Sequence, residues 1–522
     1  IDRETGLILN QNGDVTRAFR VTMPGLFTLD HGSLNDLSHE LGTALKTLPQ
    51  NAVVNFISLY YRAPYSSDFS QVNSFTSYHD LKHWHLKEIL HAEIYLLVSL
   101  SERRARPWKG GLQSPLFSTK DFLLSDKPFQ SLKHLERYQQ VFRSFEGQFA
   151  SISRMVTGVA TADEVLNLLY KFWTFDFHGQ GDPEHYVVPD IEVGRRDFLV
   201  GDKTFKVISM IKEGNDLSSG ISNPGLSGPD PATFGTMHKT RLPVSYTYPI
   251  GMGLPFDHIT SLSIELIDNE VAASVLDAQS VPLKLIRFLS PFAKVKLDAF
   301  AAYKALLYEE DLQAVNVGVN VILADSQVQR LEDQVRYVKS AFSRMYGAVP
   351  LVETLEAFPA FMYSLPGNRK DWERNHLSVL ELAVSYIPRE MPHQEDREGY
   401  YFLDRTGRPV LVNFWHSPLV TNVNQVIVGP SGSGKSFMMN GLIHKMHAQG
   451  YQVVIIDVGH SYRETCRQVN GDAGGQVRGY FDSEEKESLG INVFDFSYSG
   501  PPEGRKAALS DRKQLIYLIL KL

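Results

Sequence analysis

The most informative segment of the sequence runs from residue 426 to residue 440. It reads Val-Ile-Val-Gly-Pro-Ser-Gly-Ser-Gly-Lys-Ser-Phe-Met-Met-Asn. Three β-branched residues, Val426 to Val428, lead into a run of small residues, and helix-forming residues follow from Phe437. This order predicts a strand, a phosphate-binding loop and a helix. A Gly/Ser surface turn is the alternative interpretation, which the flanking strand and helix patterns disfavour.

The chemistry of a phosphate loop explains this spacing. Glycines let the backbone turn tightly and point its N–H groups inward at a helix N-terminus, where they cradle a phosphate. Lys435 can reach the β- and γ-phosphate oxygens, and the Ser436 hydroxyl can hold Mg²⁺. We therefore predict a nucleoside triphosphate site, with Lys435 as its catalytic residue. The predicted contact residues are Gly429, Pro430, Ser431, Gly432, Ser433, Gly434, Lys435, Ser436 and Phe437.

The composition indicates more than one folded unit. The chain has 522 residues, 43% hydrophobic and 21% charged, which is ample for buried cores and too long for one compact domain. A net charge of −7 gives no overall signal for nucleic acid or anionic lipid. The single cysteine, Cys466, excludes an internal disulfide and a multi-cysteine metal site. No apolar run reaches the length of a membrane span, and we expect both ends, Ile1 and Leu522, to be cut.

The residues before the phosphate loop carry the patterns of a mixed fold. Residues 1–160 are predicted to form an N-terminal α+β subdomain and residues 161–390 a second α+β or helical subdomain. A polar linker follows at 391–399, and residues 400–522 are assigned to the nucleotide domain.

Three segments of the second subdomain give specific expectations. We expect one strand over Phe198–Ile211, two helices over Ile267–Leu312 broken at a proline, and mostly extended chain over Leu351–Tyr363.

Two clusters of charged or metal-binding residue types receive a structural interpretation. The histidines at 79, 83, 85 and 91 lack cysteines or a His-Glu-x-x-His pattern, so a solvated helix is favoured over a metal site. The basic cluster between Arg103 and Lys109 is interpreted as an exposed turn rather than a phosphate or lipid contact.

Residues 400–522 follow the order of an α/β domain. A hairpin over Tyr400–Phe414 introduces the phosphate loop, and a second apolar strand, Gln452–Asp457, follows the loop helix. Strand, loop, helix and strand make a βαβ unit, which predicts a parallel sheet covered by helices. Asp457 is followed by Val458 and Gly459 rather than by a glutamate that could orient water. We interpret Asp457 as a strand end that assists Mg²⁺ through water, and expect the catalytic carboxylate outside this chain.

Several other segments accompany the loop. They are Met23-Pro24-Gly25-Leu26-Phe27-Thr28-Leu29, Ser364-Leu365-Pro366-Gly367-Asn368, Asp457-Val458-Gly459-His460-Ser461-Tyr462 and Gly490-Ile491-Asn492. Together with the loop they resemble the conjugative-transfer ATPases of type IV secretion systems, the VirB-type group that includes TraC, TrbE and especially the TraG-type proteins of conjugative elements. The resemblance spans nearly the whole chain, although Val493 stands where this family has proline.

The resemblance implies an N-terminal α+β domain that docks on inner-membrane components of the secretion system. It also implies a C-terminal RecA-like P-loop ATPase domain, incomplete in this chain, that assembles as hexamers or as dimers joining into hexamers. The implied ligands are ATP, with Lys435 on the phosphate, and Mg²⁺, with Ser436 as its ligand. The implied location is the cytoplasmic face of the bacterial inner membrane, as a peripheral protein. The implied function is hydrolysis of ATP to power pilus biogenesis and the transfer of DNA or protein.

Two other functions stay open. The first is a DNA translocase like the conjugative coupling proteins, which the sequence disfavours because those proteins carry N-terminal transmembrane helices. The second is a structural platform of the secretion complex that binds nucleotide without hydrolysing it. The sequence leaves the transported substrate, the number of subunits and contact with DNA undetermined.

Overall fold

The computed structural model divides the chain into two compact units. The body unit comprises Ile1–Asp68 and Leu81–Ser417, and the P-loop unit comprises Phe69–Asp80 and Pro418–Leu522. The structure describes residues 1–3, 5–9, 14–25, 31–65, 75–101, 135–179, 189–211, 233–235, 241–345, 348–368, 374–392, 399–403, 408–415, 423–455, 461–471, 510, 513–514 and 517.

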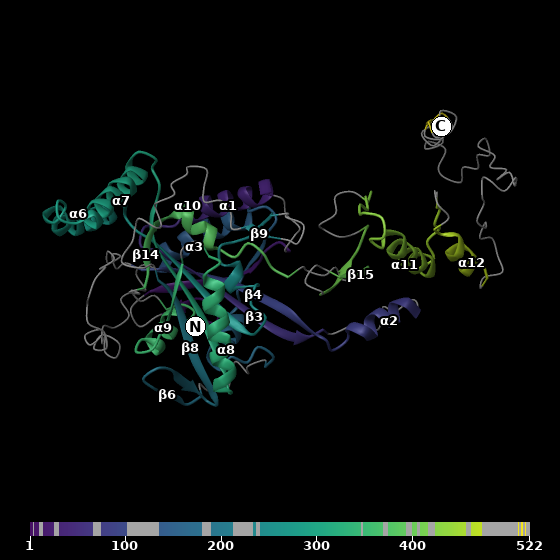
Figure 1. The fold of residues 1–522 in the computed structure, drawn as a ribbon, viewed down its shortest axis with the longest axis horizontal. Coiled ribbons are helices and arrows are strands. Elements are labelled where there is room, and N and C mark those ends of the chain that lie inside the picture. The colour runs from purple at the N-terminus through teal and green to yellow at the C-terminus, as the bar shows by residue number, and fades with distance from the viewer. Residues whose placement is uncertain are drawn as a thin grey trace. The chain divides into compact units, whose positions relative to one another are not determined.

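The body unit is built on one 12-stranded sheet, whose pairs are all antiparallel (Figure 1). The strands are β1 (Ile8–Leu9), β2 (Val15–Thr22), β3 (Val53–Pro64), β4 (Glu88–Leu100), β5 (Val156–Val159), β6 (Ile191–Val193), β7 (Phe198–Val200), β8 (Lys203–Ile211), β11 (His258–Leu266), β12 (Ala314–Asp325), β13 (Val349–Val352) and β14 (His376–Val379). Their order is β1-β2-β4-β3-β11-β12-β8-β7-β6, with β5 beside β2, β13 beside β8 and β14 beside β12.

This order joins the two predicted subdomain ranges in one sheet. Strand β3 pairs with β11 from His258 opposite Tyr60 to Glu265 opposite Val53. Strands from residues 1–160 and 161–390 therefore share a continuous hydrogen-bonded ladder. The mixed α and β content is as predicted, and the division into two subdomains stays a prediction.

Helices cover both faces of the sheet. On one face the apolar core takes side chains from α1 (His31–Lys46), α3 (Leu135–Ala150), α8 (Val328–Phe342) and the short α10 (Leu380–Ala383). On the other face it takes them from α4 (Ala162–Thr174) and α9 (Ala357–Ser364).

The remaining helices of the described residues are α2 (Phe75–Trp84), α6 (Asn269–Leu285), α7 (Pro291–Tyr308), α11 (Lys435–Ala448) and α12 (Arg463–Gly471), with 3₁₀ turns η5 (Tyr248–Ile250) and η6 (Val384–Tyr386).

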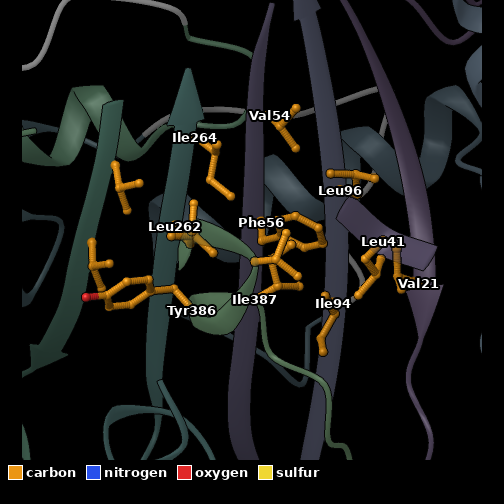
Figure 2. Close-up of a cluster of buried hydrophobic side chains, with 14 of the residues drawn as sticks. Val21, Leu41, Val54, Phe56, Ile94, Leu96, Leu262, Ile264, Tyr386 and Ile387 are labelled. Atoms are coloured by element: carbon orange, nitrogen blue, oxygen red, sulfur yellow. The ribbon is translucent and has the colours of Figure 1, made fainter. Parts of the chain in front are cut away.

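The strands divide their side chains between the two cores. In β4, Ile94 and Leu96 enter the first core, and the intervening Tyr95 enters the second. This follows from the alternation of side chains along a strand, and a strand covered on both faces is apolar throughout. Figure 2 shows the first core, where Phe56 and Leu262 of neighbouring strands lie close to Ile387.

Two local predictions were wrong. The single strand expected over Phe198–Ile211 is a hairpin, because Gly201 takes a left-handed φ of 61° and turns β7 back into β8. The extended chain expected over Leu351–Tyr363 is strand β13 followed by helix α9. In α9 the buried residues Ala357, Ala360, Phe361 and Ser364 recur at helical spacing, so the apolar period outweighed the β-propensity of the aromatic residues.

The two helices expected over Ile267–Leu312 are confirmed as α6 and α7. Pro291 begins α7 directly after its N-cap, Ser290, whereas Pro282 is accommodated inside α6 near its end. The expected hairpin before the phosphate loop is confirmed as β15 (Tyr400–Leu403) and β16 (Pro409–Val412), and it lies in the body unit. A further small ribbon pairs β9 (Thr233–Gly235) with β10 (Arg241–Pro243).

Candidate functional site

The predicted phosphate loop forms a compact turn directly before helix α11. Gly434 is the N-cap residue of α11 with a φ of 88°, and Gly432 has a φ of 79°. L-residues with a Cβ rarely adopt these left-handed conformations, so the two glycines are required by the backbone itself. Within the loop the Ser433 N–H donates to the Pro430 carbonyl at 3.2 Å, and the Met438 N–H donates to the Gly434 carbonyl at 2.9 Å.

Lys435 is folded back against the loop that precedes it. Its Nζ donates to the carbonyl of Gly429 at 2.7 Å and to that of Pro430 at 2.8 Å. A Cβ added at Gly429 would lie 2.6 Å from Ser433 Oγ, so a larger residue there would require the Ser433 hydroxyl to rotate away. The ammonium therefore lies beside the loop and is held there by two of its three possible hydrogen bonds.

The arrangement suits an anionic ligand. The first N–H groups of α11 lack intrahelical partners and carry the positive end of the helix dipole, and Lys435 adds a positive charge at the first residue of the helix. Ser431, Gly432, Ser433 and Ser436 are exposed, as is Phe437 at 86%. The Ser436 hydroxyl is an oxygen ligand of the kind Mg²⁺ prefers, so the residues present fit a magnesium-bound nucleotide.

Two residues behind the loop were not singled out from the sequence. Asn440 on α11 accepts a hydrogen bond from Thr465 of α12 through its Oδ1, and its Nδ2 donates to the Ser461 carbonyl at 3.3 Å. Thr465 is buried, and Leu442 and Ile443 of α11 are buried as well. The link fixes the start of α12 against the loop helix. No sequence pattern connects Asn440 with Thr465. Asn440 lies only one helical turn beyond Ser436, and this spacing does not identify its partner.

The predicted βαβ unit is not present in the described residues. Val426–Val428 and Gln452–Ile455 form no strand, and Val426, Val428 and Val454 are exposed by 87%, 88% and 91%. A β-strand forms only when another strand pairs with it. The described residues of the P-loop unit contain no strand. Asp457 lies outside the described residues, as do Gly490–Asn492.

The structure describes part of the histidine cluster. His83 lies on α2 and its Nε2 is 2.7 Å from Lys87 Nζ, whereas His91 lies on β4 and stacks on Tyr61. Among the described residues no group of three or more His, Cys, Asp or Glu side chains could hold a metal ion. The basic segment between Arg103 and Lys109 lies outside the described residues. Within the described part of the chain, none of the helices combines the length and the apolar character needed to cross a bilayer.

The body unit also buries charged groups that no sequence pattern indicated. Glu390 is buried, accepts a hydrogen bond from the Ser245 N–H at 3.1 Å, and lies next to the buried Arg389. Burial raises the pKa of the Glu390 carboxyl above its usual value. Lys171 of α4 is paired with Glu93 of β4 at 2.7 Å, and Tyr61 donates to the same carboxylate at 2.6 Å. These groups connect neighbouring elements of the fold.

Part of the chain is similar to a known protein family. No curated protein matches the chain. Residues 399–509 match the family model described as the TraG P-loop domain, a range that includes the β15–β16 hairpin, the phosphate loop and α11. This part of the chain is therefore similar to TraG-type conjugative P-loop proteins.

Proposed function

We propose that this protein is an ATPase of a conjugative type IV secretion system, which binds and hydrolyses ATP to power pilus biogenesis and substrate transfer. The observation that carries the proposal is Lys435 and Ser436 at the N-terminus of α11, within a segment similar to the TraG P-loop domain. The same proposal includes a RecA-like arrangement of the nucleotide domain, a hexameric assembly, and peripheral attachment to inner-membrane components on the cytoplasmic side.

Each loop residue has a defined task in this proposal. The N–H groups between Gly432 and Ser436 surround the β-phosphate, and Lys435 leaves its carbonyl partners, Gly429 and Pro430, to contact the β- and γ-phosphates. Mg²⁺ held by Ser436 supplies charge neutralisation at the phosphate oxygens. Binding therefore exchanges these two carbonyl hydrogen bonds for contacts with phosphate oxygens.

A nucleotide-binding platform without hydrolysis is the second candidate. It rests on the loop alone, since a glycine-rich turn at a helix N-terminus suits phosphate binding whether or not hydrolysis follows. Turnover of ATP distinguishes the two functions.

The test is Lys435→Ala in the whole protein, measured as ATPase activity and as conjugative transfer. We expect loss of both, because the substitution removes the ammonium that contacts the β- and γ-phosphates, with unchanged binding to partner proteins. Lys445→Ala is the matched control, since it lies ten residues further along the same helix, about 15 Å away. The control should keep full activity.

Transfer that continues unchanged in Lys435→Ala would contradict the secretion role. Wild-type protein that binds ATP and Mg²⁺ but shows no turnover would favour the platform. Hydrolysis that rises steeply with added DNA and falls with salt would favour a DNA translocase instead.

A further inference from the structure

The helical hairpin α6–α7 of the body unit ends in an exposed apolar tip. Figure 1 shows the two helices side by side, extending away from the sheet. The hairpin is firmly attached at its base, where Leu276, Phe300 and Tyr303 are buried in a small third core. Tyr303 donates to the Ser378 carbonyl at 2.8 Å and so joins α7 to β14.

The packing between the two helices changes along the hairpin. Near the base large side chains are buried, whereas towards the tip the buried residues are the small Ser280 and Ala293. Beyond them the large apolar side chains point outward: Phe288 is 94% exposed, Leu289 87% and Leu285 79%. The exposed set is Val281, Leu285, Ile286, Phe288, Leu289, Phe292 and Val295.

This concentration is unusual for the surface of a soluble protein. Exposed apolar residues scattered singly need no explanation, but a contiguous group marks a surface that is covered by a protein or a membrane. The turn between the helices is held by hydrogen bonds: the Leu289 and Ser290 N–H groups donate to the Ile286 carbonyl, and Ser290 caps α7 by accepting from the Ala293 N–H. The apolar side chains are therefore presented by an ordered turn.

The charged residues of the tip indicate which kind of surface it contacts. Residues 281–296 contain Lys284, Arg287, Lys294 and Lys296 and no acidic residue, although the whole chain has a net charge of −7. The cores of protein–protein interfaces are depleted in lysine, whereas lysines interleaved with aliphatic and aromatic side chains suit the headgroup region of an anionic membrane. There the long side chains place their stems in the apolar layer and their charges at the phosphates. Lys296 already lies over the Phe292 ring, 4.9 Å from its centroid.

We propose that the tip of the α6–α7 hairpin, residues 281–296, inserts into the interface of an anionic lipid membrane. Phe288, Leu289 and Leu285 enter the boundary of the acyl chains, and the four cations contact lipid phosphates. The inference depends on the body unit alone and not on nucleotide chemistry. It would give the proposed secretion ATPase a direct contact with lipid, in addition to any contact with membrane proteins.

Flotation of the whole protein with lipid vesicles tests the insertion. We expect binding to vesicles of phosphatidylglycerol and phosphatidylcholine, weaker binding at high salt, and little binding to pure phosphatidylcholine. Phe288→Ser with Leu289→Ser should lower the affinity by more than about tenfold, because both side chains lose their place in the apolar layer. Lys284→Gln with Arg287→Gln should lower it by roughly fivefold per cation.

Matched controls lie elsewhere on the body unit. Leu355→Ser with Val193→Ser removes two apolar side chains that are 75% and 61% exposed, and Arg195→Gln with Arg196→Gln removes two exposed cations. Both control variants should bind vesicles like the wild type. A dye on Leu289→Cys, in a Cys466→Ser background, should be quenched by brominated lipids.

Two outcomes would overturn the proposal. In the first, tip and control variants bind anionic vesicles equally. In the second, the tip variants keep vesicle binding but lose self-association or a protein partner, which would make the tip a protein interface. Lys435→Ala should bind vesicles normally, so failure of the lipid contact and failure of the ATPase assignment are separate results.

Discussion

The two units of the chain keep their structure by different means. In the body unit, β12 is buried along its whole length, because strands pair on both of its sides and cores cover both of its faces. In the described part of the P-loop unit most of these contacts are between residues close in sequence. They are two left-handed glycines and a lysine bound to nearby carbonyls, and a hydrogen bond from Thr465 to Asn440 joins α12 to α11. Three valines there stay exposed.

The stability of the body unit and the conformation of the candidate site therefore depend on different sets of contacts. The stability of the body unit depends on packing and strand pairing between residues far apart in the chain. The loop keeps its shape through bonds that span six residues or fewer, so its conformation depends little on the sheet. Substitutions in one unit should therefore have small effects on the other.

The largest expected effect is that of Phe361→Ala in α9. Phe361 is fully buried, with its ring centroid 4.9 Å from that of Phe172 and 5.0 Å from that of Phe198. Its truncation should destabilise the body unit by about 3–5 kcal/mol, measured by denaturant unfolding. Hydrogen exchange of α11 should stay unchanged, and a parallel loss of protection there would show that the two units unfold together. Leu355→Ala, at a 75% exposed position, is the control.

The second expected effect is a pH dependence of the free energy of unfolding of the body unit. His258 is fully buried against Tyr60, and burial lowers the pKa of its imidazole from 6.5 to about 4. Between pH 6.5 and 4 the unfolded chain takes up a proton that the folded state refuses, so stability falls by about 3 kcal/mol as the pH drops. His258→Gln should flatten this dependence of the free energy of unfolding. An equal slope in wild type and variant would contradict the assignment.

A smaller effect is expected in the P-loop unit from Gly434→Ala. No atom lies within 4 Å of the added Cβ, so the substitution acts only through the left-handed φ, at a cost of about 1–2 kcal/mol. The ATP affinity should fall by roughly five- to thirtyfold while the body unit unfolds normally. Gly441→Ala, which lies in α11 with equal open space, should bind ATP as the wild type does. Equal binding by both variants would contradict the required turn.

The smallest effect concerns a local element of the body unit. Thr161 caps α4, accepting from the Glu164 N–H at 3.2 Å, and Glu164 accepts from the Thr161 N–H at 2.9 Å. Thr161→Ala should cost about 1 kcal/mol, well below the effect of Phe361→Ala, because only one helix end is affected. Glu164→Gln retains the acceptor and should cost less. Calorimetry of both variants checks the order, and a reversed order would show that charge outweighs the cap.

The turn before α11 follows from the local sequence, whereas the phosphate and Mg²⁺ contacts of its residues stay predictions. The motif placed the loop and the helix after it, since glycine positions and helix starts depend on residues a few positions apart. The contacts of Lys435 with Gly429 and Pro430 needed coordinates, and so did the link between Asn440 and Thr465, which are 25 residues apart. The strands expected at Val426–Val428 and Gln452–Ile455 were wrong, because apolar character alone does not supply a pairing partner.

The amino-acid sequence was sufficient to predict the glycine-rich turn before α11, the helix pair α6–α7 and the hairpin β15–β16. Each of these follows from spacings within a few residues. The pairing of β3 with β11, which joins residues 53–64 to residues 258–266, and the exposure of the α6–α7 tip required the three-dimensional structure. The physical reason is that pairing and burial depend on contacts between residues far apart in the chain, and a local pattern specifies which side chains seek burial but not which partner provides it.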